Sequence, residues 1–159
     1  MRRLTVLTAF IVLSLVFAQQ AQAATTIPVK MTFTEPIIPA VKSGDCAVFP
    51  DGFCGMGAVI PFGHATETIE FGACGPVCDF RTVNLAEGSI FIVETFSDPE
   101  CPGACQPNPA FPGSGTLTDV IVGGTGIFEG ATGTLTGTVR AAGPQSQIKL
   151  SGSITLVDP

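Results

Sequence analysis

The chain has 159 residues, of which 19 are glycine, 13 are proline and six are cysteine, and only 13% are charged. The charged fraction is about half of the roughly 25% typical of globular domains, and so much glycine and proline argues against a helical bundle. The formal net charge of −6, with seven basic residues, argues against a nucleic-acid-binding surface, which needs a basic face.

Residues 1–23 are predicted to be a secretory signal peptide. Two arginines at positions 2 and 3 precede an apolar run over 4–18, and Ala21-Gln22-Ala23 forms a small-x-small cleavage site. The run has about 15 residues, fewer than the roughly 20 that a membrane-spanning helix needs. We therefore expect a secreted, extracytoplasmic protein, with residues 24–159 forming one domain that does not associate with membranes.

Apolar and polar residues alternate with a period of two along residues 24–159. This alternation is typical of antiparallel strands that have one buried face and one exposed face. Turn-forming pairs such as Glu87-Gly88 and Gly143-Pro144 separate the alternating segments. Strands are expected near residues 27–34, 57–62, 64–73, 79–86, 89–97, 115–122, 131–140 and 148–156.

Seven or eight short strands at this spacing predict an all-β sandwich or barrel. A β-solenoid is the competing interpretation for the glycine- and threonine-rich C-terminal half, but no fixed repeat period is present. A closed barrel leaves no exposed strand edges, which a secreted chain with few charges would otherwise have to protect. The antiparallel barrel is therefore the favoured fold.

The segment over residues 121–133, IVGGTGIFEGATG, resembles the GGTG-x-F-x-GA-x-G segment of dirigent proteins and allene oxide cyclase-like barrels. Weaker similarity extends over residues 60–157. The resemblance implies an eight-stranded, calycin-like antiparallel barrel with an apolar central cavity. Enzymes of these families use tyrosines and acids in their pockets. This chain has no tyrosine, and none of their catalytic residues maps onto it.

The glycines of this segment are predicted to be structural. A dinucleotide-binding fingerprint requires G-x-G-x-x-G at the start of a helix, whereas here three residues separate the last two glycines and a strand pattern follows. Glycine instead permits positive φ angles and close backbone approach at a barrel corner. The structural set is Gly123, Gly124, Gly126, Gly130 and Gly133.

Six cysteines, an even number in an exported chain, predict three disulfides and disulfide-stapled loops. They are Cys46, Cys54, Cys74, Cys78, Cys101 and Cys105. A turn at 50–52 favours the Cys46–Cys54 bridge. For the other four, local closures (74–78 and 101–105) and crossed closures (74–105 and 78–101) both remain open. Four-cysteine zinc binding is the rival, and export to an oxidising compartment argues against it, so no metal and no cofactor are expected.

The hairpin around Glu87-Gly88 contains the sharpest candidate for a site. A two-residue turn there would place Arg81 directly opposite Glu94, with four apolar side chains on the same face. If this face points inward, the two residues form a partly buried ion pair that could position a ligand. If it points outward, which the half-apolar opposite face slightly favours, they form an ordinary surface pair. His64, the only histidine, has no partner motif for catalysis or metal binding.

Two functions of different classes follow. The first is a non-enzymatic barrel that binds a small apolar ligand or acts as an extracellular structural protein, and an oligomer is compatible with it. The second is a cavity enzyme of the cyclase, isomerase or dirigent type, with Glu94 or Glu67 as acid or base and Arg81 holding an anion. No residue set in the sequence requires catalysis, so the first is favoured.

Overall fold

A computed structural model describes residues 23–36, 53–75, 77–96, 113–142 and 145–158. This part of the chain is nearly all β-structure. The elements are β1 (Ala24–Pro36), β2 (Phe53–Ile60), β3 (Gly63–Gly75), β4 (Cys78–Leu85), β5 (Gly88–Phe96), β6 (Gly113–Gly124), the 3-10 turn η3 (Gly126–Phe128), β7 (Thr132–Ala142) and β8 (Gln145–Val157). The predicted signal peptide and three of the cysteines, Cys46, Cys101 and Cys105, lie outside the described residues.

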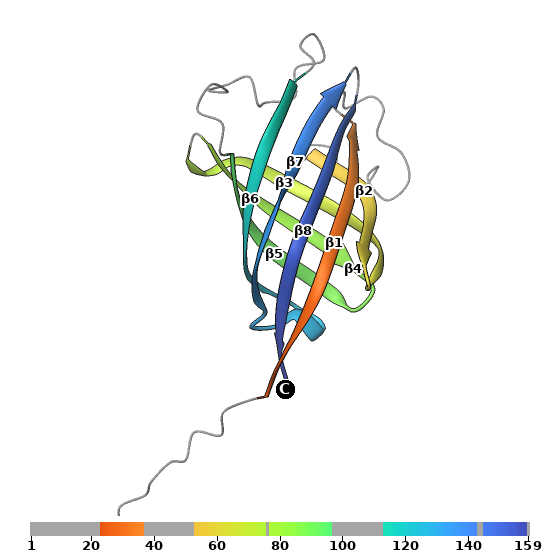
Figure 1. The fold of residues 1–159 in the computed structure, drawn as a ribbon, viewed down its shortest axis with the longest axis vertical. Coiled ribbons are helices and arrows are strands. Elements are labelled where there is room, and N and C mark those ends of the chain that lie inside the picture. Colours follow the sequence, from red (N-terminus) through yellow and green to blue (C-terminus); the bar gives the residue numbers. More distant parts are fainter. Residues whose placement is uncertain (1–22, 37–52, 76, 97–112, 143–144, 159) are drawn as a thin grey trace, which may run out of the picture.

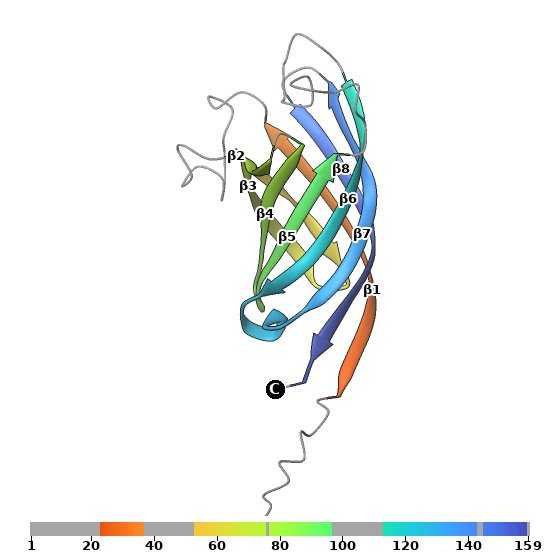
Figure 2. The same ribbon diagram turned by 90° about the vertical axis from the view of Figure 1, so that its left-hand side faces the viewer.

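The eight strands form one closed antiparallel barrel in which each strand pairs with its neighbours in sequence (Figure 1). The ring closes between β1 and β8, which pair from Ala24↔Val157 to Pro36↔Gln145. Figure 2 shows the same ring from the side, with β6, β7 and β8 curving around it. The predicted barrel is confirmed. Within the described ranges, no helix is long and apolar enough to span a bilayer.

The barrel has two different ends. At one, here called the η3 end, short turns join β2 to β3 and β4 to β5, η3 lies between β6 and β7, and the amide of Asp158 donates a hydrogen bond to the carbonyl of Ala23. At the other, here called the loop end, β1, β3, β5 and β7 end and β2, β4, β6 and β8 begin. Both the start of β1 and the end of β8 therefore lie at the η3 end.

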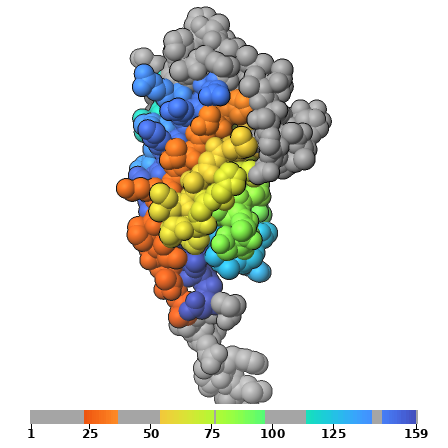
Figure 3. Space-filling view, turned by 90° about the vertical axis from the view of Figure 1, so that its right-hand side faces the viewer, coloured from red at the N-terminus to blue at the C-terminus, as the bar shows by residue number. Residues whose placement is uncertain are grey.

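Alternation along each strand directs apolar side chains into the barrel, as the pattern predicts. The buried core includes Val29, Met31, Phe33, Val59, Val83, Ile90, Ile92, Ile121, Phe128, Leu135, Ile148 and Ile154. Phe128 of η3 is fully buried, and the ring of Phe62 packs edge-on against it with centroids 5.1 Å apart. In the space-filling view, β1, β2 and β3 close over the interior on one face (Figure 3).

The register of the β4–β5 hairpin differs from the expected one. Leu85 pairs with Gly88, so the two turn residues are Ala86 and Glu87, and Arg81 lies opposite Ile92 instead of Glu94. The cause is tertiary: the amide of Ile127 in η3 donates to the carbonyl of Glu87, which fixes the turn from outside the hairpin. A shift of two residues leaves every side chain on its expected face.

The hairpin face that carries Arg81 and Glu94 points inward. Both side chains are 1% exposed. The expectation that this face looks outward is therefore wrong. The opposite face is only partly buried, and on it the rings of Phe80 and Phe91 lie with their centroids 6.1 Å apart. The inward face is the drier one because the closed barrel surrounds it on all sides.

A disulfide joins Cys74 and Cys78 across the β3–β4 turn, with Cα atoms 5.1 Å apart. This selects local closure for these two cysteines and excludes the crossed pairings 74–105 and 78–101. Cys54 is also disulfide-bonded, and the expected Cys46–Cys54 bridge lies outside the described residues.

Gly124, at the end of β6, and Gly126, at the start of η3, allow backbones to meet closely at the η3 end. A Cβ atom on Gly124 would lie 2.2 Å from the carbonyl oxygen of Ser89, and one on Gly126 would lie 2.1 Å from that of Glu87. Gly126 also has a φ of 62°, which is unfavourable for other residues. Of the remaining predicted glycines, Gly123 lies in β6, Gly130 follows η3 and Gly133 lies in β7.

We predict that Gly126→Ala lowers the free energy of unfolding by about 1–3 kcal/mol, because it adds both a clash with backbone and a strained φ. Gly115→Ala is the matched control: its Cβ would meet the Val139 side chain at 3.4 Å, so we expect a change within about 0.5 kcal/mol. Chemical denaturation of both variants measures the difference. Equal stabilities would contradict the structural role of Gly126.

Candidate functional site

A cluster of charged side chains fills the part of the barrel interior nearer the loop end. Arg81 is its only cation among the described residues, and five carboxyl groups from five strands surround it. All are at most 5% exposed. The members of this interior cluster are Glu35 (β1), Glu67 (β3), Asp79 and Arg81 (β4), Glu94 (β5), Asp119 (β6) and Ser146 (β8).

Arg81 holds the cluster together through its guanidinium group. Nε and Nη2 donate to one oxygen of Glu94 at 3.0 and 2.7 Å, and Nη1 donates to Glu35 at 3.2 Å and to Glu67. The Ser146 hydroxyl donates to the second oxygen of Glu35. One side chain thus ties β4 to its two neighbours, β3 and β5, and to the distant strand β1, as the planar donor array of arginine allows.

The cluster has more carboxyl groups than one cation can neutralise. The amide of Gly72 donates to Asp79 at 2.6 Å, but both oxygens of Asp119 and one oxygen of Glu67 are buried without a hydrogen-bond partner. An isolated buried carboxylate is strongly unfavourable, and such groups bind a proton instead. The geometry therefore predicts that part of the cluster is protonated in the folded protein.

The pKa directions agree with this expectation. Burial raises the pKa of Glu67 well above its ordinary value, although Arg81 opposes the shift. Burial, with a further contribution from Glu94, raises the pKa of Asp119 to about 8. Burial also raises the pKa of Glu94 and of Asp79. Arg81 remains charged, because the surrounding carboxylates raise its pKa despite its burial.

A glycine in β2 makes room for the carboxyl groups. A Cβ atom on Gly55 would lie 2.4 Å from Oε1 of Glu67 and 3.0 Å from Cγ of Glu35. Any larger residue at this inward position would displace one of the two acids. The glycine in β2 therefore leaves the space that the acidic side chains of β1 and β3 occupy.

Sequence reasoning identified part of this cluster. Arg81 and Glu94 form the expected ion pair, and Glu67, named as an alternative acid, contacts the same guanidinium. It missed Glu35, Asp79, Asp119 and Ser146. For Asp119 a signal existed, since this acid sits on the apolar face of the strand between Leu117 and Ile121. Nothing local indicates that Glu35 approaches Arg81, 46 residues away.

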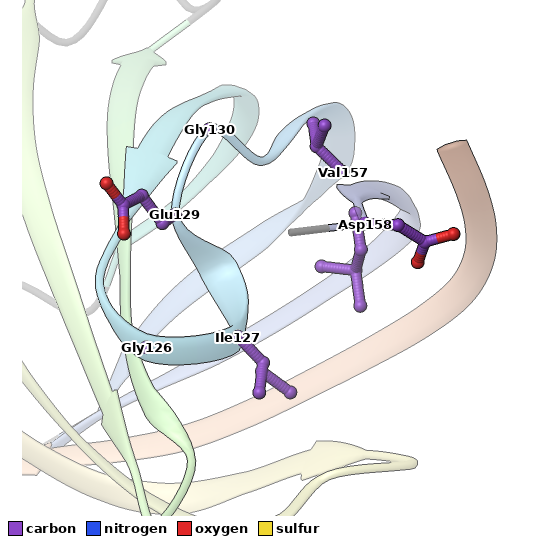
Figure 4. Close-up of a pocket in the computed structure, with 7 residues that line it drawn as sticks. Gly126, Ile127, Glu129, Gly130, Val157 and Asp158 are labelled. Atoms are coloured by element: carbon purple, nitrogen blue, oxygen red, sulfur yellow. The ribbon is translucent and has the colours of Figure 1, made fainter. Parts of the chain in front are cut away.

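A surface hollow lies outside the barrel at the η3 end, with a volume of about 850 Å³. Figure 4 shows Ile127 and Val157 at its walls, with Glu129 and Asp158 on opposite sides in that view. Its lining residues are Gly126, Ile127, Glu129, Gly130, Leu156, Val157 and Asp158. The interior cluster is not part of this hollow.

His64 lies exposed on β3, opposite Ala58 of β2, and does not belong to the cluster. Among the residues that the structure describes, no three histidine, cysteine or acidic side chains are arranged to hold a metal ion. Comparisons with models of protein families, with curated proteins and with solved structures found no match to this chain.

We predict that Arg81→Met destabilises the protein by about 3–5 kcal/mol at pH 7, because it leaves buried carboxylates without their cation. Arg140→Met, which removes an exposed arginine from β7, is the control and should change stability by less than about 0.5 kcal/mol. In a double-mutant cycle with Glu94→Gln, a coupling below about 0.5 kcal/mol would contradict the buried ion pair.

We predict that the free energy of unfolding falls as the pH rises from about 4 to about 8. The pKa of Asp119 in the folded state, about 8, keeps this group protonated over most of the range, and the raised pKa of Glu67 acts in the same direction, whereas the unfolded chain releases both protons at lower pH. Each such group lowers stability by up to about 1.4 kcal/mol per pH unit.

Urea denaturation at pH 5, 6, 7 and 8 measures this slope. Glu67→Gln should reduce the slope, and Glu129→Gln, which changes an exposed acid, should leave it unchanged. Stability that rises over this pH range would contradict the protonated cluster.

Proposed function

We propose that this protein is a secreted, disulfide-stabilised, non-enzymatic β-barrel that binds a small, largely apolar molecule in the hollow at the η3 end. The interior cluster is structural in this proposal. The barrel supplies a rigid frame, and the turn at η3 supplies the binding surface.

The hollow carries the proposal. Its volume of about 850 Å³ falls in the range of about 300–1,000 Å³ typical of small-molecule sites. Ile127 is 46% exposed at its edge, and Leu156 and Val157 supply further apolar wall. Because Gly126 and Gly124 anchor η3 against the β4–β5 turn, this wall is held in place before a ligand arrives, which reduces the entropy lost on binding.

Burial of the interior cluster supports a non-enzymatic role. A catalytic group must reach its substrate, but Arg81, Glu67 and Glu94 are each at most 1% exposed. The Cys74–Cys78 disulfide is compatible with an oxidising, extracytoplasmic compartment. These features suit a stable extracellular binding protein.

We also propose a relationship to the allene oxide cyclase-like and dirigent-like barrels. It is supported by the closed eight-stranded antiparallel ring and by the position of the glycine-rich segment, which turns the chain from β6 through η3 into β7. Fold alone does not transfer an activity.

A cavity enzyme of the cyclase or isomerase type is the second candidate. The observation in its favour is that Glu67 has a raised pKa and an unpartnered oxygen beside Arg81. Such a carboxylic acid could donate a proton while Arg81 holds the developing anion, with Glu94 as base. This function requires substrate entry from the loop end.

We predict saturable binding of Nile red, a neutral apolar dye, to the purified protein, measured by its fluorescence. Ile127→Ser should weaken binding by about threefold to tenfold, since it removes part of the apolar wall. Val120→Ser, which changes a similarly exposed residue on β6, is the control. Absence of saturable binding, or equal effects of the two variants, would contradict the proposal. Dye binding that is lost in Glu67→Gln but kept in Ile127→Ser would favour the interior site.

A further inference from the structure

Three acidic residues lie side by side in one row across neighbouring strands. Asp79 on β4 is directly opposite Glu94 on β5, and Glu94 is directly opposite Asp119 on β6. All three side chains point into the barrel and are at most 5% exposed. Cβ atoms of directly opposed residues are about 5 Å apart, and like charges at this spacing repel.

The two halves of this row are stabilised unequally. Asp79 accepts a hydrogen bond from the Gly72 amide, and Glu94 accepts two from Arg81. Asp119 has no partner for either oxygen. Within the row, a negative charge on Asp119, at the boundary between β5 and β6, would therefore receive the least stabilisation.

The pairing across the same boundary is irregular next to this row. An irregularity between Phe91 and Ile92 interrupts the pairing of β5 with β6 on one side of the row. On the other side of the row, the described pairs are Thr95↔Thr118 and Phe96↔Leu117. The described stretch beyond the irregularity, here called the β5–β6 seam, consists of five residue pairs, 92–96 with 117–121.

We propose that the β5–β6 seam is a proton-controlled opening into the barrel, closed while the acidic row holds its protons and released when Asp119 ionises opposite Glu94. The seam separates locally, with the irregularity at Phe91 as the hinge, and the rest of the ring stays paired. Opening exposes the interior cluster to solvent from the loop-end side.

Among the groups that face Asp119, only Arg81 attracts its charge, and no group gives it a hydrogen bond. From β4 come Arg81, whose donors are committed to Glu94, Glu35 and Glu67, and Asp79. β1 and β3 contribute only further acids, β2 contributes Gly55, and β8 contributes the Ser146 hydroxyl. Leu135 of β7 lies directly opposite Asp119 and is apolar. Among the described residues, no second cation is buried near it.

The β4–β5 boundary provides the internal contrast. It also carries two opposed acids, but its pairing runs without interruption from Cys78 to Leu85, and the amide of Phe96 donates to Val77 beyond its end. Arg81 and the Gly72 amide compensate both acids there. Ionisation should therefore open the β5–β6 seam first.

Amide hydrogen exchange of the full chain at pH 5 to 9, corrected for intrinsic rates, tests this proposal. We expect the opening constant of the seam to rise by up to about tenfold per pH unit between pH 5 and 8 and then to level off. Amides in the β1–β8 pairing should have a lower opening constant than the seam at every pH, because they open only when the whole barrel unfolds. Equal opening constants around the ring, or a seam that does not respond to pH, would overturn the proposal.

Asp119→Asn removes the charge and should flatten the pH profile of the seam. Asp158→Asn changes an exposed acid at the η3 end and should keep the wild-type profile. Where Asp119→Asn does not fold, Glu94→Gln relieves the same repulsion from the other side and should also flatten it. A folded Asp119→Asn protein that retains the full slope would overturn the role of this residue.

Discussion

The interior of this barrel depends on one buried guanidinium. Arg81 donates hydrogen bonds to carboxylates from β1, β3 and β5, so it connects strands that do not neighbour one another in the ring. A buried ion pair contributes little net stability, because desolvation offsets the attraction, but removal of one partner is strongly unfavourable. The main effect of Arg81 is therefore on the arrangement of the strands: a buried guanidinium needs carboxylate partners, so the strands that carry these acids must place them around it.

The excess of acids over this one cation determines how the protein responds to its surroundings. Among the described residues, five buried carboxyl groups accompany one buried guanidinium, so at near-neutral pH the folded state retains protons that the unfolded chain has already released. Most proteins lose stability in acid because their paired carboxylates become protonated. This barrel should instead be most stable in mild acid.

The two ends of the barrel divide the proposed roles. At the η3 end, close backbone contacts through Gly124 and Gly126 hold a rigid turn against the β4–β5 hairpin, and a partly apolar hollow lies beside it. Towards the loop end, the core becomes charged, and the strand pairing between β5 and β6 is irregular between this charged part and the η3 end. The proposed binding surface thus lies on the rigid η3 end, and the proposed opening lies beside the cluster that binds and releases protons.

The sequence by itself determined the properties that are local. Alternation with a period of two predicted the strands and their two-faced pattern, although it favoured the wrong inward face for the β4–β5 hairpin. The hairpin brought Arg81 and Glu94 within reach even though its expected register was two residues off. Only the tertiary structure decided that register, because η3 fixes the turn from a distant part of the chain. Ring closure between β1 and β8 likewise decided that Glu35 joins the cluster, since strand pairing between remote segments follows from global packing and leaves no local trace in the sequence.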